Sequence, residues 1–145
     1  MRKILIPIDS GSSAARMKSA VAEAVAFYRR EAVAIHLLSV QANVTSHVAM
    51  FFKGGELNEI QHQAGAEELA PAEALLAAAG IPYTSSVVVG RKAETIARLA
   101  RELGCDRIVM GQEAGAGLAG RIFGSLAGQV RQLVGGTSDC QVLGS

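Results

Sequence analysis

The sequence predicts an α/β domain of three layers, in which a parallel β-sheet lies between two layers of helices. Apolar runs at residues 4–8 and 33–40 are nearly continuous, which is typical of strands that are covered on both faces. Segments with apolar residues at three and four residue spacing separate such runs, as helices do in a parallel sheet. The 145 residues, 50% of them hydrophobic, suffice for a single domain, residues 1–145, with a buried core.

The first two strands and the helix between them form a βαβ unit, whose crossover is expected to be right-handed. Ser12 or Ser13 can cap this helix by accepting hydrogen bonds from its first backbone N–H groups. Its apolar stripe consists of Met17, Val21, Ala24, Val25 and Tyr28.

A second helix is expected over residues 57–79, ending at Gly80. Pro71 lies inside it and costs about 3 kcal/mol at such a position, so the helix can divide into two pieces near Ala70. The apolar residues expected to face the sheet are Leu57, Ile60, Ala64, Leu69, Leu75 and Leu76.

The rest of the chain continues the alternation. Ligands of parallel sheets gather outside the carboxyl ends of the strands, where the strand order switches, and here those ends are Asp9, Val40, Gly90 and Gly111. The remaining elements are expected to be a strand at residues 87–89, a helix at 93–103, a strand at 107–110, a helix at 126–134 and a strand at 140–143.

Composition excludes several classes of protein. A net charge of +1 and the absence of tryptophan argue against nucleic-acid binding. The chain has neither a signal peptide nor a membrane-spanning run, so no membrane partner and a cytoplasmic location are expected. Cys105 and Cys140 lack metal-ligand spacing, and we expect both to be packing residues in a reducing compartment.

A cradle for phosphate is expected between residues 106 and 125. An apolar run ends at Met110 and Gly111, and a glycine-rich loop then leads to Gly124, Ser125 and a helix. Unpaired N–H groups and a hydroxyl at the positive end of a helix favour anions. This arrangement predicts a nucleotide-binding site.

Several segments taken together form a pattern that is hard to reach by chance. They are Ile6-Pro7-Ile8-Asp9, Leu37-Leu38-Ser39-Val40, Val89-Gly90-x-x-Ala93-x-x-Ile96-x-x-x-Ala100, Asp106-x-Ile108-Val109-Met110-Gly111, Gly117-Leu118 and Gly124-Ser125. With these segments, residues 3–143 resemble the universal stress protein family.

The resemblance implies an adenine nucleotide alpha hydrolase-like fold, with five parallel strands in the order 3-2-1-4-5, and a homodimer that acts in stress adaptation or signalling. In one branch of the family it also implies an adenine nucleotide such as ATP or AMP, with Mg²⁺ where the ligand is a triphosphate. The histidines and acids of the chain give little support for catalysis, so no enzymatic activity is expected. The implied nucleotide-binding residues are Asp9 beside the adenosine, Pro7 and Val40 flanking the base, Met110 and Gly111 at the exit of the fourth strand, and Gly124 and Ser125 on the phosphates.

The loop departs from the family's ATP-binding pattern, Gly-x-x-Gly, nine residues, Gly-Ser/Thr. Ala114 replaces the middle glycine, and Ala127 lacks a hydroxyl that often follows. Glu113 stands where binding members often carry a basic residue, and a carboxylate about 4 Å from a phosphate costs on the order of 4 kcal/mol. Arg121, within the same loop, can compensate. These departures leave ATP binding and its loss as two open predictions.

Other readings of the sequence have less support. Residues 115–120 satisfy the fingerprint Gly-x-Gly-x-x-Gly, but they follow the fourth strand and not the first, so a dinucleotide site is not expected. His36 lies within an apolar strand and is expected to be a hydrogen-bonded core residue. Asp9 can cap the following helix or contact ribose, and slow hydrolysis with Asp9 near Mg²⁺ is the less favoured alternative.

The main alternative function is a dimeric signalling or scaffold protein of the same fold that binds no nucleotide. The last strand, from Cys140 to Leu143, is a short apolar edge that would pair with its twofold mate. Gln141 replaces a proline that is usual in the family, which leaves an additional N–H to pair. Residues 44–55, which include Phe51 and Phe52, are expected to form a loop on the chain's own sheet or dimer mate, with a protein partner as the second choice.

Overall fold

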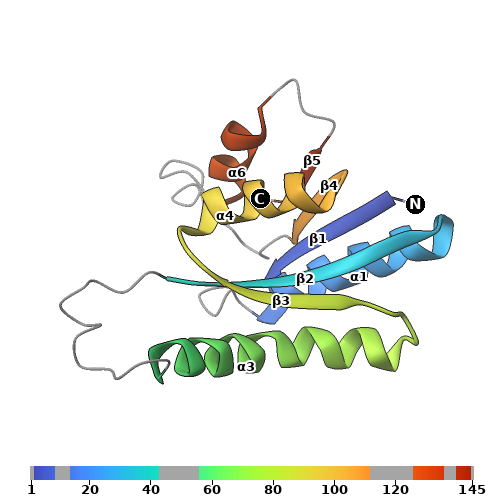
Figure 1. Cartoon of the computed structure of the whole chain (residues 1–145). Coiled ribbons are helices and arrows are strands. Elements are labelled where there is room, and N and C mark those ends of the chain that lie inside the picture. The colour runs from blue at the N-terminus through green and yellow to red at the C-terminus, as the bar shows by residue number, and fades with distance from the viewer. Residues whose placement is uncertain (1, 9–13, 43–55, 112–125, 136–139, 145) are drawn as a thin grey trace.

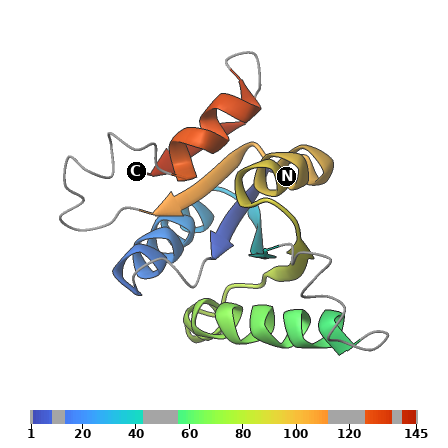
Figure 2. The same cartoon turned by 90° about the vertical axis from the view of Figure 1, so that its left-hand side faces the viewer.

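Five parallel strands form a single sheet in the order β3-β2-β1-β4-β5, as the sequence predicts (Figure 1). The structure, a computed structural model, describes residues 2–8, 14–42, 56–111, 126–135 and 140–144. Helices α1 and α3 cover one face of the sheet, and α4 and α6 cover the other (Figure 2). The elements are β1 (Arg2–Ile8), α1 (Ala14–Arg30), β2 (Val33–Gln41), α3 (Glu56–Ala78), β3 (Thr84–Val89), α4 (Lys92–Leu103), β4 (Arg107–Gly111), α6 (Leu126–Val134) and β5 (Gln141–Gly144).

Strand β3 begins three residues earlier than the valine run predicts. Thr84, Ser85 and Ser86 pair with β2 in register with His36, Leu37 and Leu38. Both Thr84 and Ser85 are exposed, because β3 is the outer strand of the sheet and its amino end has little cover. Sequence patterns based on hydrophobicity miss such a strand end, since its residues need not be apolar.

Helix α3 runs through Pro71 without a break, so the division near Ala70 that the proline made possible does not occur. Pro71 and Glu67 are both exposed, and the carbonyl of Glu67, which loses its helical partner at the proline, can bind water. The stripe that faces the sheet also differs from the prediction, because Ile60 and Leu75 are 49% and 37% exposed. Within residues 59–78, whose burial the structure describes, the buried residues are Gly65, Leu69, Ala72 and Leu76.

Small residues set how closely α3 approaches the sheet. A Cβ atom built on Gly65 would lie 2.5 Å from Cγ1 of Val87 on β3. Glycine therefore lets the helix backbone rest directly on the outer strand.

A hydrogen bond also joins α3 to the sheet. Glu68, one residue before the buried Leu69, accepts this bond from the hydroxyl of Ser39 at 3.0 Å, and Ser39 is fully buried on β2.

Two apolar clusters hold the layers together, one on each face of the sheet. The cluster under α1 and α3 is centred on Ile4, Ile6 and Leu37, and the cluster under α4 and α6 on Leu5 and Ile108. Alternation along β1 sends neighbouring residues to opposite faces. This alternation also decides which residues of the sheet face the candidate site.

Candidate functional site at the carboxyl edge of the sheet

The sheet opens between β1 and β4 toward its carboxyl edge. β1 pairs with β2 at every residue from Arg2 to Ile8, whereas it pairs with β4 only at Ile4 and Leu5. Both strands continue for three residues beyond their last pair, Leu5 with Ile108. The strand order changes direction between the same two strands, because β2 follows β1 on one side and β4 lies on the other. A crevice at such a switch point is where open α/β sheets bind their ligands.

Glycine at the end of β4 allows that strand to lean onto α1. Gly111 has a φ of +74°, and a Cβ atom there would lie 2.2 Å from the carbonyl oxygen of Arg16. Gly144 at the end of β5 packs in turn against Gly111, whose carbonyl oxygen a Cβ atom would approach at 2.6 Å. Close backbone contacts therefore draw the end of β4 toward α1 and β5.

Three of the predicted site residues share one face of the sheet. Val40 and Met110 belong to the apolar cluster under α4 and α6, and Pro7 follows Leu5 of that cluster by two residues along β1. Val40 and Met110 are 6% and 5% exposed, whereas Pro7 is half-buried. Gly111 points to the opposite face, against α1. The structure thus brings Pro7, Val40, Met110 and Gly111 to the carboxyl ends of three adjacent strands.

The other predicted site residues, Asp9, Gly124 and Ser125, lie outside the described residues. The same holds for the loop residues Glu113, Ala114 and Arg121, and for the predicted loop at residues 44–55. Helix α6 begins at Leu126, directly after Ser125, so its N-terminus immediately follows the predicted phosphate loop. Ala127 is fully buried in the cluster under α4 and α6, where it is a packing residue.

The turn from β3 to α4 also lies at this edge. From the sequence, Gly90 is expected only to end a strand. The N–H of Gly90 donates to the carbonyl of Gln41 at 2.9 Å. A Cβ atom on Gly90 would lie 2.5 Å from Oγ1 of the buried Thr95 in α4. Glycine is therefore required for the close contact between this turn and α4. A glycine followed five residues later by threonine was the available signal.

His36 has a structural environment, as the sequence predicts, although its side chain is half-buried rather than in the core. Its Nδ1 lies 2.6 Å from the hydroxyl of Thr84, and its Nε2 lies 2.8 Å from the hydroxyl of Ser86. Burial, together with the positive charge of Lys3, lowers the pKa of His36 below its usual 6.5. The neutral ring therefore ties the outer strand β3 to β2.

Neither Cys105 nor Cys140 forms a disulfide, and both line a cavity of about 340 Å³ between the ends of α4 and α6. Burial raises the pKa of the Cys105 thiol to about 11 and also raises the pKa of Cys140. Such thiols are poor nucleophiles at neutral pH. Within the part of the chain that the structure describes, no group of three or more His, Cys, Asp or Glu residues could hold a metal ion.

Gln141 uses its N–H inside the chain. This group donates to the carbonyl of Asp106 at 2.8 Å, at the start of the pairing between β4 and β5. The N–H that the sequence left open for a partner is therefore already paired. Among the described helices, none is long and apolar enough to cross a membrane.

Comparisons with known proteins point to one family. The family model described as "Universal stress protein family" matches residues 1–142. No curated protein matches the chain.

Solved structures with this fold include several with adenine nucleotides. A universal stress protein in complex with cAMP is 19% identical, with 99% of this chain and 96% of that chain covered and a TM-score of 0.71. A universal stress protein from Archaeoglobus fulgidus in complex with dAMP is 18% identical, with 99% and 97% covered and a TM-score of 0.64. A family protein from Arabidopsis thaliana with AMP bound is 15% identical, with 99% and 90% covered and a TM-score of 0.61.

Proposed function

The chain belongs to the universal stress protein family, and from this we propose that it binds an adenine nucleotide in the crevice between β1 and β4, as a noncatalytic step in stress adaptation or signalling. The observation that carries the proposal is the opening of the sheet at the switch point, where β1 and β4 stop pairing after Leu5 and Ile108. Structural relatives named for cAMP, dAMP and AMP share the fold in which this crevice occurs, which supports an adenine nucleotide as the ligand.

The described residues support a division of roles within the site. Pro7, Val40 and Met110 offer apolar side chains on one face of the sheet, suited to the flat face of a purine. The N-terminus of α6 offers backbone N–H groups for a phosphate. We assign Asp9 to the ribose, Gly111 to the backbone wall, and Gly124 and Ser125 to the phosphate, with Mg²⁺ where the ligand is a triphosphate.

The base-flanking residues limit where a base can enter, and the charge of the loop bears on how many phosphates the ligand carries. Val40 and Met110 are nearly covered by the protein itself, so a base must enter against Pro7 and the outer rim of these side chains. Glu113 would repel a triphosphate more strongly than a monophosphate, because the γ-phosphate adds further negative charge. We therefore expect AMP to bind at least as tightly as ATP.

The test begins with protein purified without added nucleotide, which is denatured so that any released small molecule can be identified. AMP and ATP with Mg²⁺ are then titrated into the native protein by calorimetry. We expect a Kd for AMP tighter than about 100 μM, equivalent to about 5.5 kcal/mol of binding free energy, and a weakening of about tenfold in Ser125→Ala. Ser85→Ala, on the exposed end of β3, is the matched control and should bind as the wild type does. Empty protein that yields no binding heat would refute the proposal.

A second candidate function, a dimeric scaffold without nucleotide, is favoured by the edge strand β5. This strand pairs with β4 on one side only, and its Val142 and Leu143 side chains pack on opposite faces of the sheet. We propose a homodimer through this strand, from Cys140 to Leu143. Retained self-association in a protein that binds no nucleotide would support the scaffold function in place of the first candidate.

A further inference from the structure

A cavity of about 610 Å³ opens at the amino edge of the sheet, at the opposite end from the nucleotide crevice. Its walls come from the last turn of α1, the first residues of β2 and the segment before β3. These segments lie at the same end of the sheet (Figure 1). Val33 and Ile35 give it an apolar floor, since both are almost fully buried and belong to the core. A volume of this size falls within the range of ordinary small-molecule sites, about 300–1,000 Å³.

The two tyrosines of the chain both line this cavity. Tyr28 comes from α1 and Tyr83 from the segment that leads into β3, and the sequence contains no other tyrosine and no tryptophan. A hydrogen bond to the carboxylate of Glu73 raises the pKa of Tyr83, so its hydroxyl is engaged. The tyrosine rings can then pack against a flat ring, because aromatic pairs favour offset or edge-to-face contact.

The ion pairs at the cavity mouth leave the guanidinium of Arg29 without a charged partner among the described residues. The carboxylate of Glu31 is held by Arg107 at 2.7 Å and by Arg2 at 3.4 Å, and Arg30 lies over the ring of Phe27 with its Cζ 5.0 Å from the centroid. Arg29, in contrast, forms no ion pair or hydrogen bond with any residue in the described part of the chain, and it is exposed.

The end of α1 does not cancel this positive charge. Its final turn carries Arg29 and Arg30, and the carbonyl of Phe27 accepts a hydrogen bond from the N–H of Glu31 at 3.0 Å. The negative end of a helix amounts to roughly half an elementary charge, so Arg29 and Arg30 leave this end with a net positive charge. A free guanidinium beside tyrosine rings matches a carboxylate attached to an aromatic ring, which it can bind through two N–H groups.

From this arrangement we propose that the cavity binds an aromatic carboxylate, with Tyr28 and Tyr83 packing against the ring and Arg29 pairing with the carboxylate. This site is separate from the proposed nucleotide crevice, because its residues lie at the amino ends of β2 and β3. Both ligands should therefore bind at the same time.

The test uses 2-naphthoate as the probe and the neutral 2-naphthamide as its matched partner. Native protein labelled with ¹³C at its tyrosines gives ring signals from Tyr28 and Tyr83 alone, which Tyr28→Phe and Tyr83→Phe assign. We expect 2-naphthoate to shift both sets of signals with a saturable Kd in the high micromolar range, and 2-naphthamide to bind about tenfold more weakly. Saturating AMP should leave the Kd for 2-naphthoate unchanged.

Two variants make the test specific. Arg29→Gln should weaken 2-naphthoate about tenfold while leaving 2-naphthamide unchanged, and it changes only an exposed side chain. Arg98→Gln, an exposed arginine on α4 that pairs with Glu102, is the control and should bind 2-naphthoate as the wild type does. The proposal would be overturned if the two probes bound with equal affinity, or if Arg29→Gln bound 2-naphthoate as tightly as the wild type. It would also be overturned if AMP displaced 2-naphthoate, because the probe would then lie in the nucleotide crevice. A failure of AMP to bind would leave this result intact.

Discussion

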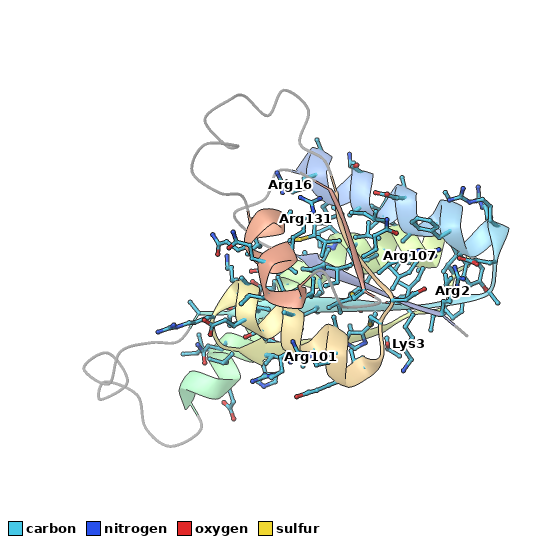
Figure 3. The ribbon with its side chains drawn as sticks, turned by 90° about the horizontal axis from the view of Figure 1, so that it is seen from above. Arg2, Lys3, Arg16, Arg101, Arg107 and Arg131 are labelled. Carbon is cyan, nitrogen blue, oxygen red and sulfur yellow. The ribbon has the colours of Figure 1, made fainter. Side chains whose placement is uncertain are left out.

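The two edges of the sheet are built differently. At the amino edge, Arg2, Glu31, Asp106 and Arg107 form a network of ion pairs across β1, β4 and the residue that follows α1, and Arg107 also stacks on Phe27. At the carboxyl edge, β1 and β4 part, and glycines bring backbone against backbone. Figure 3 shows Arg2 and Arg107 together at one end of the sheet, with Arg16 and Arg131 toward the other. Side-chain ion pairs therefore tie β1 to β4 at the amino edge, whereas the same two strands part at the carboxyl edge, where the candidate site lies.

The largest expected effect comes from adding a methyl group at the carboxyl edge. Gly111→Ala forces alanine into a left-handed conformation and places its Cβ 2.2 Å from the carbonyl oxygen of Arg16. We expect a loss of roughly 3 kcal/mol or more in the free energy of unfolding, about 1–2 from conformation and the rest from the clash, measured by urea denaturation.

Gly104→Ala is the matched control for this substitution. Gly104 has nearly the same φ, +70°, at the C-terminus of α4, but a Cβ there would meet nothing within 4 Å. It should therefore cost only about 1 kcal/mol. Equal losses in the two variants would show that the end of β4 does not depend on close contact with α1.

The next effect tests the amino edge. Arg107→Leu removes the ion pair with Glu31 and the stacking on Phe27, whose ring centroid lies 4.3 Å from the guanidinium carbon. The Arg107 side chain is only 14% exposed, so the loss should reach about 1 kcal/mol in the free energy of unfolding. Arg98→Leu, in an exposed pair on α4, should change this free energy by less than about 0.5 kcal/mol. If both variants behaved alike, the network at the amino edge would not stabilise the fold.

The fold was largely predictable because its signals are local. Continuous apolar runs predicted β1 and β2, and Gly104 predicted where α4 ends. The N–H of Gly104 donates to the carbonyls of Ala100 and Arg101. The buried stripe of α3 was predicted only in part, because Gly65 and Ala72 pack by having little or no side chain, which a hydrophobic pattern does not register.

The candidate site was predictable as a location but not in its contacts. The position of Gly111 at the end of a strand was visible in the sequence, whereas its contact with Arg16, 95 positions earlier in the chain, depends on how α1 crosses the sheet. The cavity beside Tyr28 and Tyr83 was likewise not visible, because residues from three separate segments form it.

A smaller effect concerns the open side of β5. Arg131 on α6 donates from Nη2 to the carbonyl of Val142 at 3.3 Å and also to the carbonyl of Gly144. Gln141 donates its N–H toward β4, and the backbone groups of successive residues in a strand point to alternate sides. The carbonyl groups of Val142 and Gly144 therefore point toward the outer edge, where a second strand would need them as acceptors. We expect Arg131→Gln to tighten self-association about fivefold, measured by sedimentation. Arg101→Gln, on α4, should leave the self-association constant unchanged, and a weaker dimer in Arg131→Gln would mean that Arg131 supports the interface.

The smallest effect is a dependence of stability on pH at the amino edge. The hydrogen bond from Arg107 is the main cause that lowers the pKa of Glu31 below its usual 4.5, with the charges of Arg2 and Arg107 adding to it and burial opposing it. The folded protein therefore favours the ionised carboxylate, and the stability this provides is fully present above pH 4.5 and is lost as the pH falls through the lower folded value. Urea midpoints of the wild type should exceed those of Glu31→Gln at pH 7 and converge with them below pH 4.5, whereas Glu94→Gln, in an exposed pair with Arg91, should follow the wild type throughout. A constant difference in urea midpoint between wild type and Glu31→Gln at every pH would mean that the carboxylate contributes through packing and not through its charge. The contrast between a bonded amino edge and an open carboxyl edge would then rest on Arg107 and Phe27 alone.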